Sequence, residues 1–145
     1  MPPGKGYEDA GNAIRTRFKA DWMVPGPVPR TPIAYDNGRY EPVDGTAWVR
    51  LSILDGDAEQ ADLAPSPRMR HVGLVVVGIF VPSGKLDGAA RALGDAAAAI
   101  FRRLVLPTAA GDKILFRAPA YRVIGTEPPW HQASVTTAFY RDSIF

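Results

Sequence analysis

Apolar residues recur every three or four positions near the start of the chain, which predicts an amphipathic helix. The predicted helix runs from about Glu8 to Trp22, and acidic Glu8 and Asp9 suit the positive end of its dipole. The prolines between Val24 and Pro29 end it, because proline cannot donate a backbone hydrogen bond. The apolar stripe of this helix contains Tyr7, Ala10, Ile14, Phe18 and Trp22.

A second periodic stretch, from about Leu86 to Leu106, predicts another helix. A face of small residues, Ala89, Ala92, Ala96 and Ala99, suits close packing against a sheet or a partner helix. The predicted core stripe contains Leu86, Ala90, Leu93, Ala97, Ile100, Phe101 and Leu104.

A half-buried strand is predicted from Trp48 to Leu54, because Val49, Leu51 and Ile53 share one face and Trp48, Arg50 and Ser52 share the other. Asp55-Gly56 either turns or bends this strand, and residues from Ala58 to Leu63 are a candidate continuation. Shorter patterns predict further strands at Ile33 to Tyr35, Lys113 to Arg117, Tyr121 to Gly125 and His131 to Tyr140.

The stretch from Met69 to Val81 is apolar at odd and even positions alike. It therefore predicts a central strand covered on both faces. With only two predicted helices, the second cover is expected from a neighbouring subunit. Gly73 and Gly78 permit a close approach of another chain segment or a bulge.

The order helix, strands, helix, strands indicates an α+β fold. We expect a mixed, mostly antiparallel sheet flanked by two helices, in a single domain over residues 1–145. A proline-rich loop at about 23–46 interrupts the pattern. A connection of that length either wraps its own domain or is ordered by a partner.

Composition narrows the function classes. The chain has 145 residues and no cysteine, which excludes disulfides, thiolate metal sites and cysteine nucleophiles. Its net charge of +2 comes from mixed signs without a block of five like charges, which argues against groove-reading DNA recognition. No apolar run is long enough to span a membrane, and we expect no secretory signal.

Candidate chemistry is sparse. His71 and His131 stand outside any metal-ligand spacing, and Gly84-Lys85 fails the phosphate-loop pattern. The acidic run of Asp55, Asp57, Glu59 and Asp62 has three interpretations: a solvated strand face, a partner for arginines of another subunit, or oxygen ligands of a hard cation. We expect no catalytic, cofactor-binding or metal site. The alternatives are a small metal-assisted hydrolase using these acids with His71, or a ligand-binding domain with an apolar pocket.

A succession of short motifs covers nearly the whole chain. It comprises Phe18-Lys19-Ala20-Asp21-Trp22, Thr31-Pro32-Ile33-Ala34-Tyr35-Asp36-Asn37, Trp48-Val49-Arg50-Leu51, Glu59-Gln60-Ala61, Arg70-His71-Val72-Gly73-Leu74, Ile79-Phe80-Val81-Pro82, Phe116-Arg117-Ala118-Pro119, Trp130-His131-Gln132 and Phe139-Tyr140. In order and spacing these motifs resemble the tail terminator family of long-tailed phages and related prophage or gene-transfer particles. The segment from Val24 to Pro29 departs from that family's pattern.

The resemblance implies a structural virion protein without a catalytic site or cofactor. It would form a homohexameric ring on the head-proximal end of the tail tube, where it stops polymerisation of the tube protein and docks the head connector. DNA would pass through the lumen without specific binding, no membrane would be involved, and assembly would take place in the host cytoplasm. The alternative in the same particle is another neck, head–tail joining or head-closure protein.

A ring needs a head-to-tail interface, so each subunit must offer two different faces. We expect the acidic run, opposed to arginines, to set the register between neighbours, or to face the lumen and repel DNA. The residues predicted for the subunit interface are Asp55, Asp57, Glu59, Asp62, Arg68, Arg70, Trp48 and Arg50.

Overall fold

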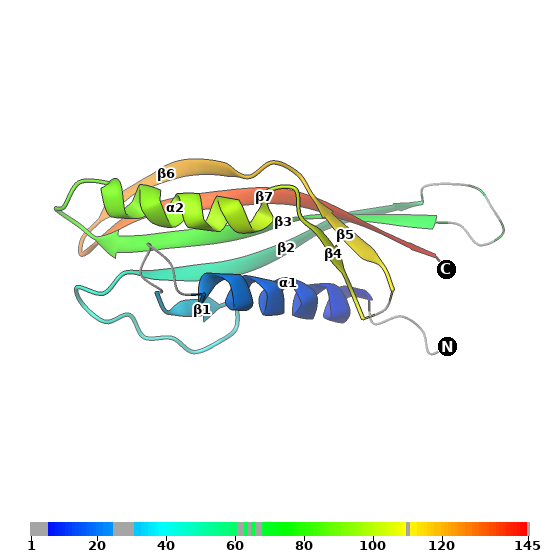
Figure 1. The fold of residues 1–145 in the computed structure, drawn as a ribbon, viewed down its shortest axis with the longest axis horizontal. Coiled ribbons are helices and arrows are strands. Elements are labelled where there is room, and N and C mark those ends of the chain that lie inside the picture. Colours follow the sequence, from blue (N-terminus) through cyan, green and yellow to red (C-terminus); the bar gives the residue numbers. More distant parts are fainter. Residues whose placement is uncertain are drawn as a thin grey trace.

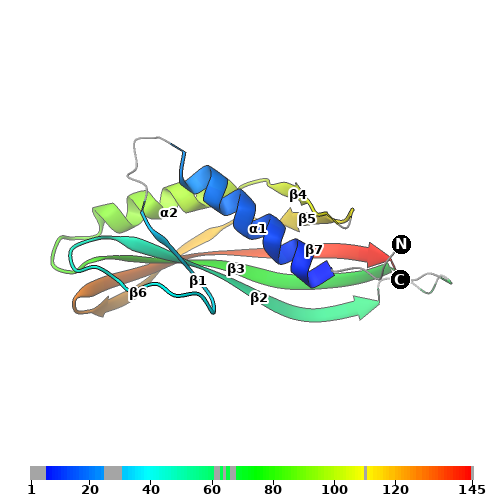
Figure 2. The ribbon, with the colours of Figure 1, turned by 90° about the horizontal axis from the view of Figure 1, so that it is seen from below.

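In a computed structural model, the described residues form seven strands of one sheet and two helices that lie across one of its faces (Figures 1 and 2). The structure describes residues 6–24, 31–60, 63, 65, 68–109 and 111–144. The elements are α1 (Gly6–Trp22), β1 (Ile33–Tyr35), β2 (Trp48–Gln60), β3 (Arg68–Pro82), α2 (Gly88–Phe101), β4 (Val105–Pro107), β5 (Lys113–Phe116), β6 (Ala120–Glu127) and β7 (Trp130–Ile144).

The strand order is β1-β2-β3-β7-β5-β4, and β6 also pairs with β7. Only the pairing of β1 with β2 is parallel, and all other pairs are antiparallel. β5 and β6 share the same edge of β7, β5 pairing with its Phe139–Arg141 end and β6 with its Trp130–Thr136 end. The predicted α+β fold, with a mixed, mostly antiparallel sheet and two helices, is confirmed.

One hydrophobic core lies between the helices and the sheet. On the helix-bearing face of β3, Val75, Val77, Ile79 and Val81 are at most 1% exposed, which places their side chains wholly inside the core. Burial of one such side chain stabilises the fold by roughly 1.5–3 kcal/mol. In α1, Phe18 is stacked on Trp22 and on Phe101 of α2, so aromatic contacts join the two helices over the sheet.

The predicted stripe of α1 is confirmed except at its first member. The other members, Ala10, Ile14, Phe18 and Trp22, are buried and follow one another at intervals of four positions. Tyr7 is 54% exposed, because its phenol reaches outward to the Nδ1 atom of His71 at 3.2 Å.

The prediction for the second helix was wrong at both ends. Leu86 has a φ of 52° and is 91% exposed, so it stands outside the helix and outside the core. At the other end Arg103 has a φ of 57°, in the left-handed region that stops a helix. The chain then continues as β4, whose Leu106 pairs with Ile114 of β5. Ala89, Ala92 and Ala99 are exposed, so most of the predicted small-residue face has no cover within the protomer.

β3 is central in the sheet, but only one of its faces is covered within the protomer. Both helices lie on the same side (Figure 2), and on the other side Val72 is 42% and Leu74 39% exposed. The second cover, which we expect from a neighbouring subunit, stays a prediction. We call this second surface the open face. None of the helices in the described part of the chain is long and apolar enough to cross a membrane.

β2 is one continuous strand, so Asp55-Gly56 bends it and does not turn it. The pairing with β3 shifts register between Asp55 and Ala58, which marks a bulge. Beyond the bulge, the far ends of β2 and β3 extend past the helices (Figure 1).

Candidate subunit interface

The outer edge of β2 carries acidic side chains. β1 pairs with β2 only as far as Leu51, so from Ser52 to Glu59 the outer edge of β2 has no strand partner among the described residues. Asp55, Asp57 and Glu59 are exposed, and none of the ion pairs in the described ranges includes them. We call Ser52–Glu59 the acidic edge.

In a regular extended strand, the three acids of this edge would point to the same face. In β2 they do not. Asp55 pairs with Gly73, on the helix-bearing side, whereas Glu59 pairs with Arg70, on the open side, because the bulge between them reverses the alternation. Across the described residues, no three histidine or acidic side chains come together to hold a metal ion. The arrangement does not suit the cation site that a single acidic face would offer.

Arg70 is engaged inside its own protomer. Its Nε and Nη2 atoms donate hydrogen bonds to the two carboxylate oxygens of Asp142 at 2.9 and 3.0 Å, and its guanidinium lies 4.6 Å from the ring centre of Tyr140. The bond from Arg70 lowers the pKa of Asp142 below its ordinary value of 3.8. Arg68, at the start of β3, is exposed, and its charge also lowers the pKa of Asp142.

On the open face, the Trp48 and Arg50 side chains contact other residues of the same chain. Trp48 is only 5% exposed, with its ring stacked on Phe80 at a centroid distance of 4.0 Å. Arg50 lies 5.8 Å from the Trp48 ring and donates to the Tyr35 carbonyl oxygen at 3.4 Å. Trp48 therefore offers little surface to a neighbour.

Asp62, the last of the predicted interface residues, lies outside the described residues.

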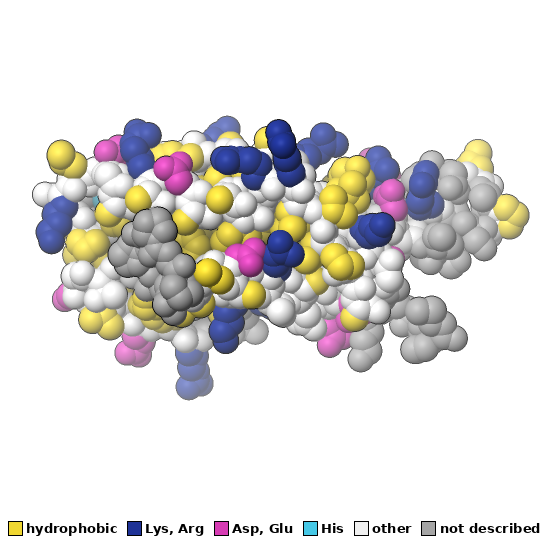
Figure 3. All heavy atoms as spheres, viewed as in Figure 1, with side chains coloured by type: hydrophobic (Ala, Val, Ile, Leu, Met, Phe, Trp, Pro, Cys, Tyr) yellow, Lys and Arg dark blue, Asp and Glu magenta, His cyan; other side chains and the backbone are white. Residues whose placement is uncertain are grey.

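The opposite edge of the sheet is basic. β6 pairs only with β7, so its outer edge also lacks a strand partner in the described part of the chain. Arg117 lies between β5 and β6, and Arg122 lies in β6, whose one acid is Glu127. Lys and Arg side chains gather along the margin formed by α2 and β6 (Figure 3). We call Arg117–Glu127 the basic edge.

No local pattern in the sequence marks Arg117 and Arg122 as candidate site residues, because their candidacy comes from the place of β6 in the sheet. Arg122 is exposed and takes part in none of the ion pairs of the described residues. Arg117 lies 5.7 Å from the Tyr140 ring centre and is also exposed.

The open face holds a shallow apolar groove between the two edges. Its volume is about 380 Å³, and Leu54, Val72, Leu74 and Ala138 line it, with Arg70 and Arg117 beside Tyr140. Leu54 is 51% exposed, so apolar surface of this face is available for contact.

The two histidines lie in separate cross-strand contacts. His71 joins Tyr7 of α1 to Ser143 of β7 through its two ring nitrogens, at 3.2 and 2.9 Å. Burial lowers the pKa of His71, and the charge of Arg141 adds to the effect. His131 contacts the Thr126 hydroxyl at 2.9 Å. Both positions join structural elements.

An α+β sheet with a partly apolar open face and two strand edges that lack a partner among the described residues is typical of proteins that assemble with other subunits. The sequence pattern of the phage tail terminator proteins matches residues 11–139, so the chain belongs to the phage tail terminator family. It is therefore a structural protein of a phage tail, and a component of the virion.

Solved structures share the fold. One that carries no functional description is similar over 98% of this chain and 99% of its own, with a TM-score of 0.76 and 17% identity. A chain from the virion of a native gene transfer agent particle is similar over 96% of this chain and 99% of its own, with a TM-score of 0.54 and 19% identity. No curated protein matches the chain.

Proposed function

We propose that this protein forms a homohexameric ring on the head-proximal end of the tail tube. In that position it ends polymerisation of the tube protein and provides the joint to the head connector. Family membership over residues 11–139 carries the proposal. The ring assembles in the host cytoplasm, and DNA passes through its lumen without specific binding.

The geometry of the chain supports the ring. A closed ring of identical subunits uses a head-to-tail contact between two different surfaces. The acidic edge and the basic edge are two such surfaces, and they lie on opposite sides of one sheet. The open apolar face and the exposed Ala89, Ala92 and Ala99 of α2 remain for the tube protein and the connector.

Mass measurement of the purified protein at several concentrations, followed by negative-stain imaging, tests ring formation. We expect a six-subunit species that grows with concentration and rings with a central hole. A monomer at every concentration, with no rings at isolated tube ends, would contradict the proposal. A particle map with the protein bound to the connector alone, away from the tube, would instead favour a head-closure or joining protein.

A further inference from the structure

We propose that neighbouring subunits of the ring join through their sheet edges, the acidic edge of one copy lying against the outer edge of β6 in the next. The contact is antiparallel, and Asp57 and Glu59 face Arg122 and Arg117. This inference rests on the proposed ring and names the surfaces that form it.

Both edges have hydrogen-bonding groups to offer. The outer sides of Ser52–Glu59 in β2 and of Ala120–Glu127 in β6 have no strand partner among the described residues. An exposed strand edge presents backbone N–H and C=O groups that can pair with another chain. Two such edges on opposite sides of one sheet allow each copy to bind one neighbour on either side.

The charges select the pairing of unlike edges. Residues 52–59 contain three acids and no base, whereas residues 117–127 contain two bases and one acid. Two acidic edges repel each other, and so do two basic edges, because like charges across a strand pair are destabilising. Only an acidic edge against a basic edge is favourable. The signs therefore disfavour a two-fold dimer and favour a head-to-tail chain of subunits.

The strand directions fit as well. β2, β3, β7 and β6 are antiparallel in succession, so β2 of one copy runs antiparallel to β6 of the next when both lie in one continuous sheet. When the two free segments are centred on each other, Asp57 lies level with Arg122. In that register Glu59 lies toward Ala120 and Arg117.

The offset of the two edges suits a closed ring. Through the strand register, Ser52–Glu59 lies level with residues 136–142 of β7, whereas β6 lies level with residues 130–136. The centres are therefore about six residues apart, or about 20 Å along the strands. Spread over four interstrand spacings of about 4.8 Å, this offset corresponds to a strand tilt of about 45°. Closed sheets have tilts of roughly 35–45°.

Paired charge reversals test the contact. One variant carries D57K and E59K, so both of its edges are basic; the other carries R117E and R122E, so both of its edges are acidic. Each is supplied to a host whose phage or prophage lacks the gene. We expect either variant alone to lower the yield of infectious particles by at least 100-fold. Supplied together they restore the yield to within about tenfold of wild type, because they alternate around a ring with every contact acid against base.

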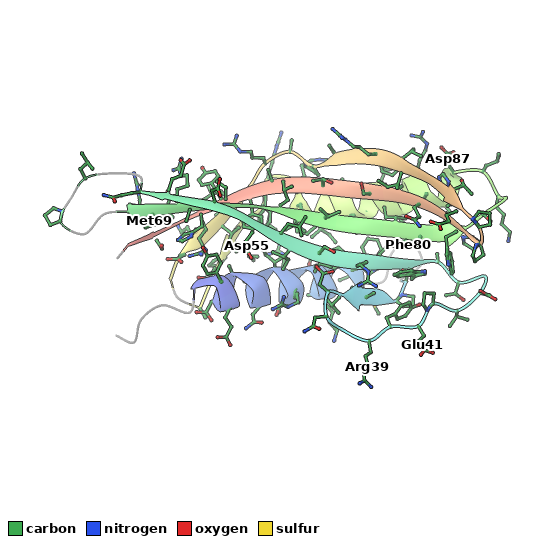
Figure 4. The ribbon with its side chains drawn as sticks, turned by 180° about the vertical axis from the view of Figure 1, so that it is seen from behind. Arg39, Glu41, Asp55, Met69, Phe80 and Asp87 are labelled. Atoms are coloured by element: carbon green, nitrogen blue, oxygen red, sulfur yellow. The ribbon has the colours of Figure 1, made fainter. Side chains whose placement is uncertain are left out.

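Two further variants complete the design. A single chain with all four reversals again has one acidic and one basic edge, and it restores particles by itself. The matched control, E41K with D44K, reverses two exposed acids of the loop after β1, and it complements like wild type. Glu41 lies on this loop, well apart from Asp55 (Figure 4). Unfolding midpoints confirm that every variant is folded.

The outcomes separate this inference from the proposed ring. If wild-type rings form and a reversed variant alone complements fully, or the folded pair gives no more particles than either variant, edge pairing is wrong and the ring stands. If the wild-type protein forms no ring, in solution or at tube ends, both proposals fail together.

Discussion

Gly73 provides a sharp test of the packing between β2, β3 and β7. A Cβ atom added there would lie 2.5 Å from the Cζ atom of Phe139 and 2.8 Å from the Leu54 carbonyl oxygen. The ring of Phe139 is 4% exposed, and the carbonyl belongs to a paired strand, so neither group can yield without moving its strand. We expect the substitution Gly73→Ala to force β2 and β3 apart locally.

The expected magnitude follows from two opposing effects. Overpacking of this kind destabilises a core by about 1–3 kcal/mol, and a clash with backbone falls at the upper end. Alanine also reduces the conformational entropy of the unfolded chain, which offsets about 0.4–1 kcal/mol of that destabilisation. The net loss for Gly73→Ala is therefore about 2 kcal/mol, and Tm falls by roughly 4–8 °C.

Gly78 in the same strand is the matched control. A Cβ atom there would meet its nearest neighbour, the Cε2 atom of Phe80, at 3.3 Å, and the nearest backbone atom at 3.8 Å. Gly78→Ala is expected to change the free energy of unfolding by less than about 0.5 kcal/mol, or to raise it slightly. Urea unfolding followed by tryptophan fluorescence, at a concentration where one species is present, measures both. Equal stability of the two variants would refute the packing described for Gly73.

Three further substitutions probe the core, a buried ion pair and a surface ion pair. Phe18 is 0% exposed and stacks on two aromatic rings, so F18A should lower the free energy of unfolding by about 3–5 kcal/mol in the same urea assay. R141M should lower the free energy of unfolding by about 3 kcal/mol, because the mostly buried Asp112 carboxylate then lacks the Arg141 partner that lies at 2.9 Å. In a double-mutant cycle, R141M combined with D112L should regain most of that free energy. Asp142 has a folded-state pKa below 3.8, so its bond to Arg70 stabilises the fold above that pH and is lost as pH falls through the lowered pKa. The stability gap between wild type and R70M should therefore close between neutral pH and about pH 2, and a constant gap would contradict the assignment.

Local patterns predicted much of the fold because burial and periodicity are local properties. The stripe from Ala10 to Trp22 and the short strand Ile33–Tyr35 needed no long-range information. The two ends of the second helix could not be predicted, since Leu86 and Arg103 adopt positive φ angles that their residue types do not indicate. The covering of β3 was also beyond local patterns, because placing both helices on one face is a tertiary property.

The surroundings of the candidate interface residues were harder to predict than the core. Arg70 pairs with Asp142, which lies 72 residues further along the chain, and no local spacing indicates that contact. The bulge after Asp55 reverses the faces of the acids, and alternation alone cannot reveal it. Arg117 and Arg122 become notable only once the sheet order places β6 on an edge opposite β2.

The distribution of tail lengths tests the central claim most directly. Particles made without this protein, imaged by negative stain, should show tails of variable and excessive length and tails without heads, because nothing ends growth of the tube. Supply of the wild-type protein in trans should restore one tail length and attached heads. Tails of normal, uniform length joined to heads in the absence of the protein would contradict the account.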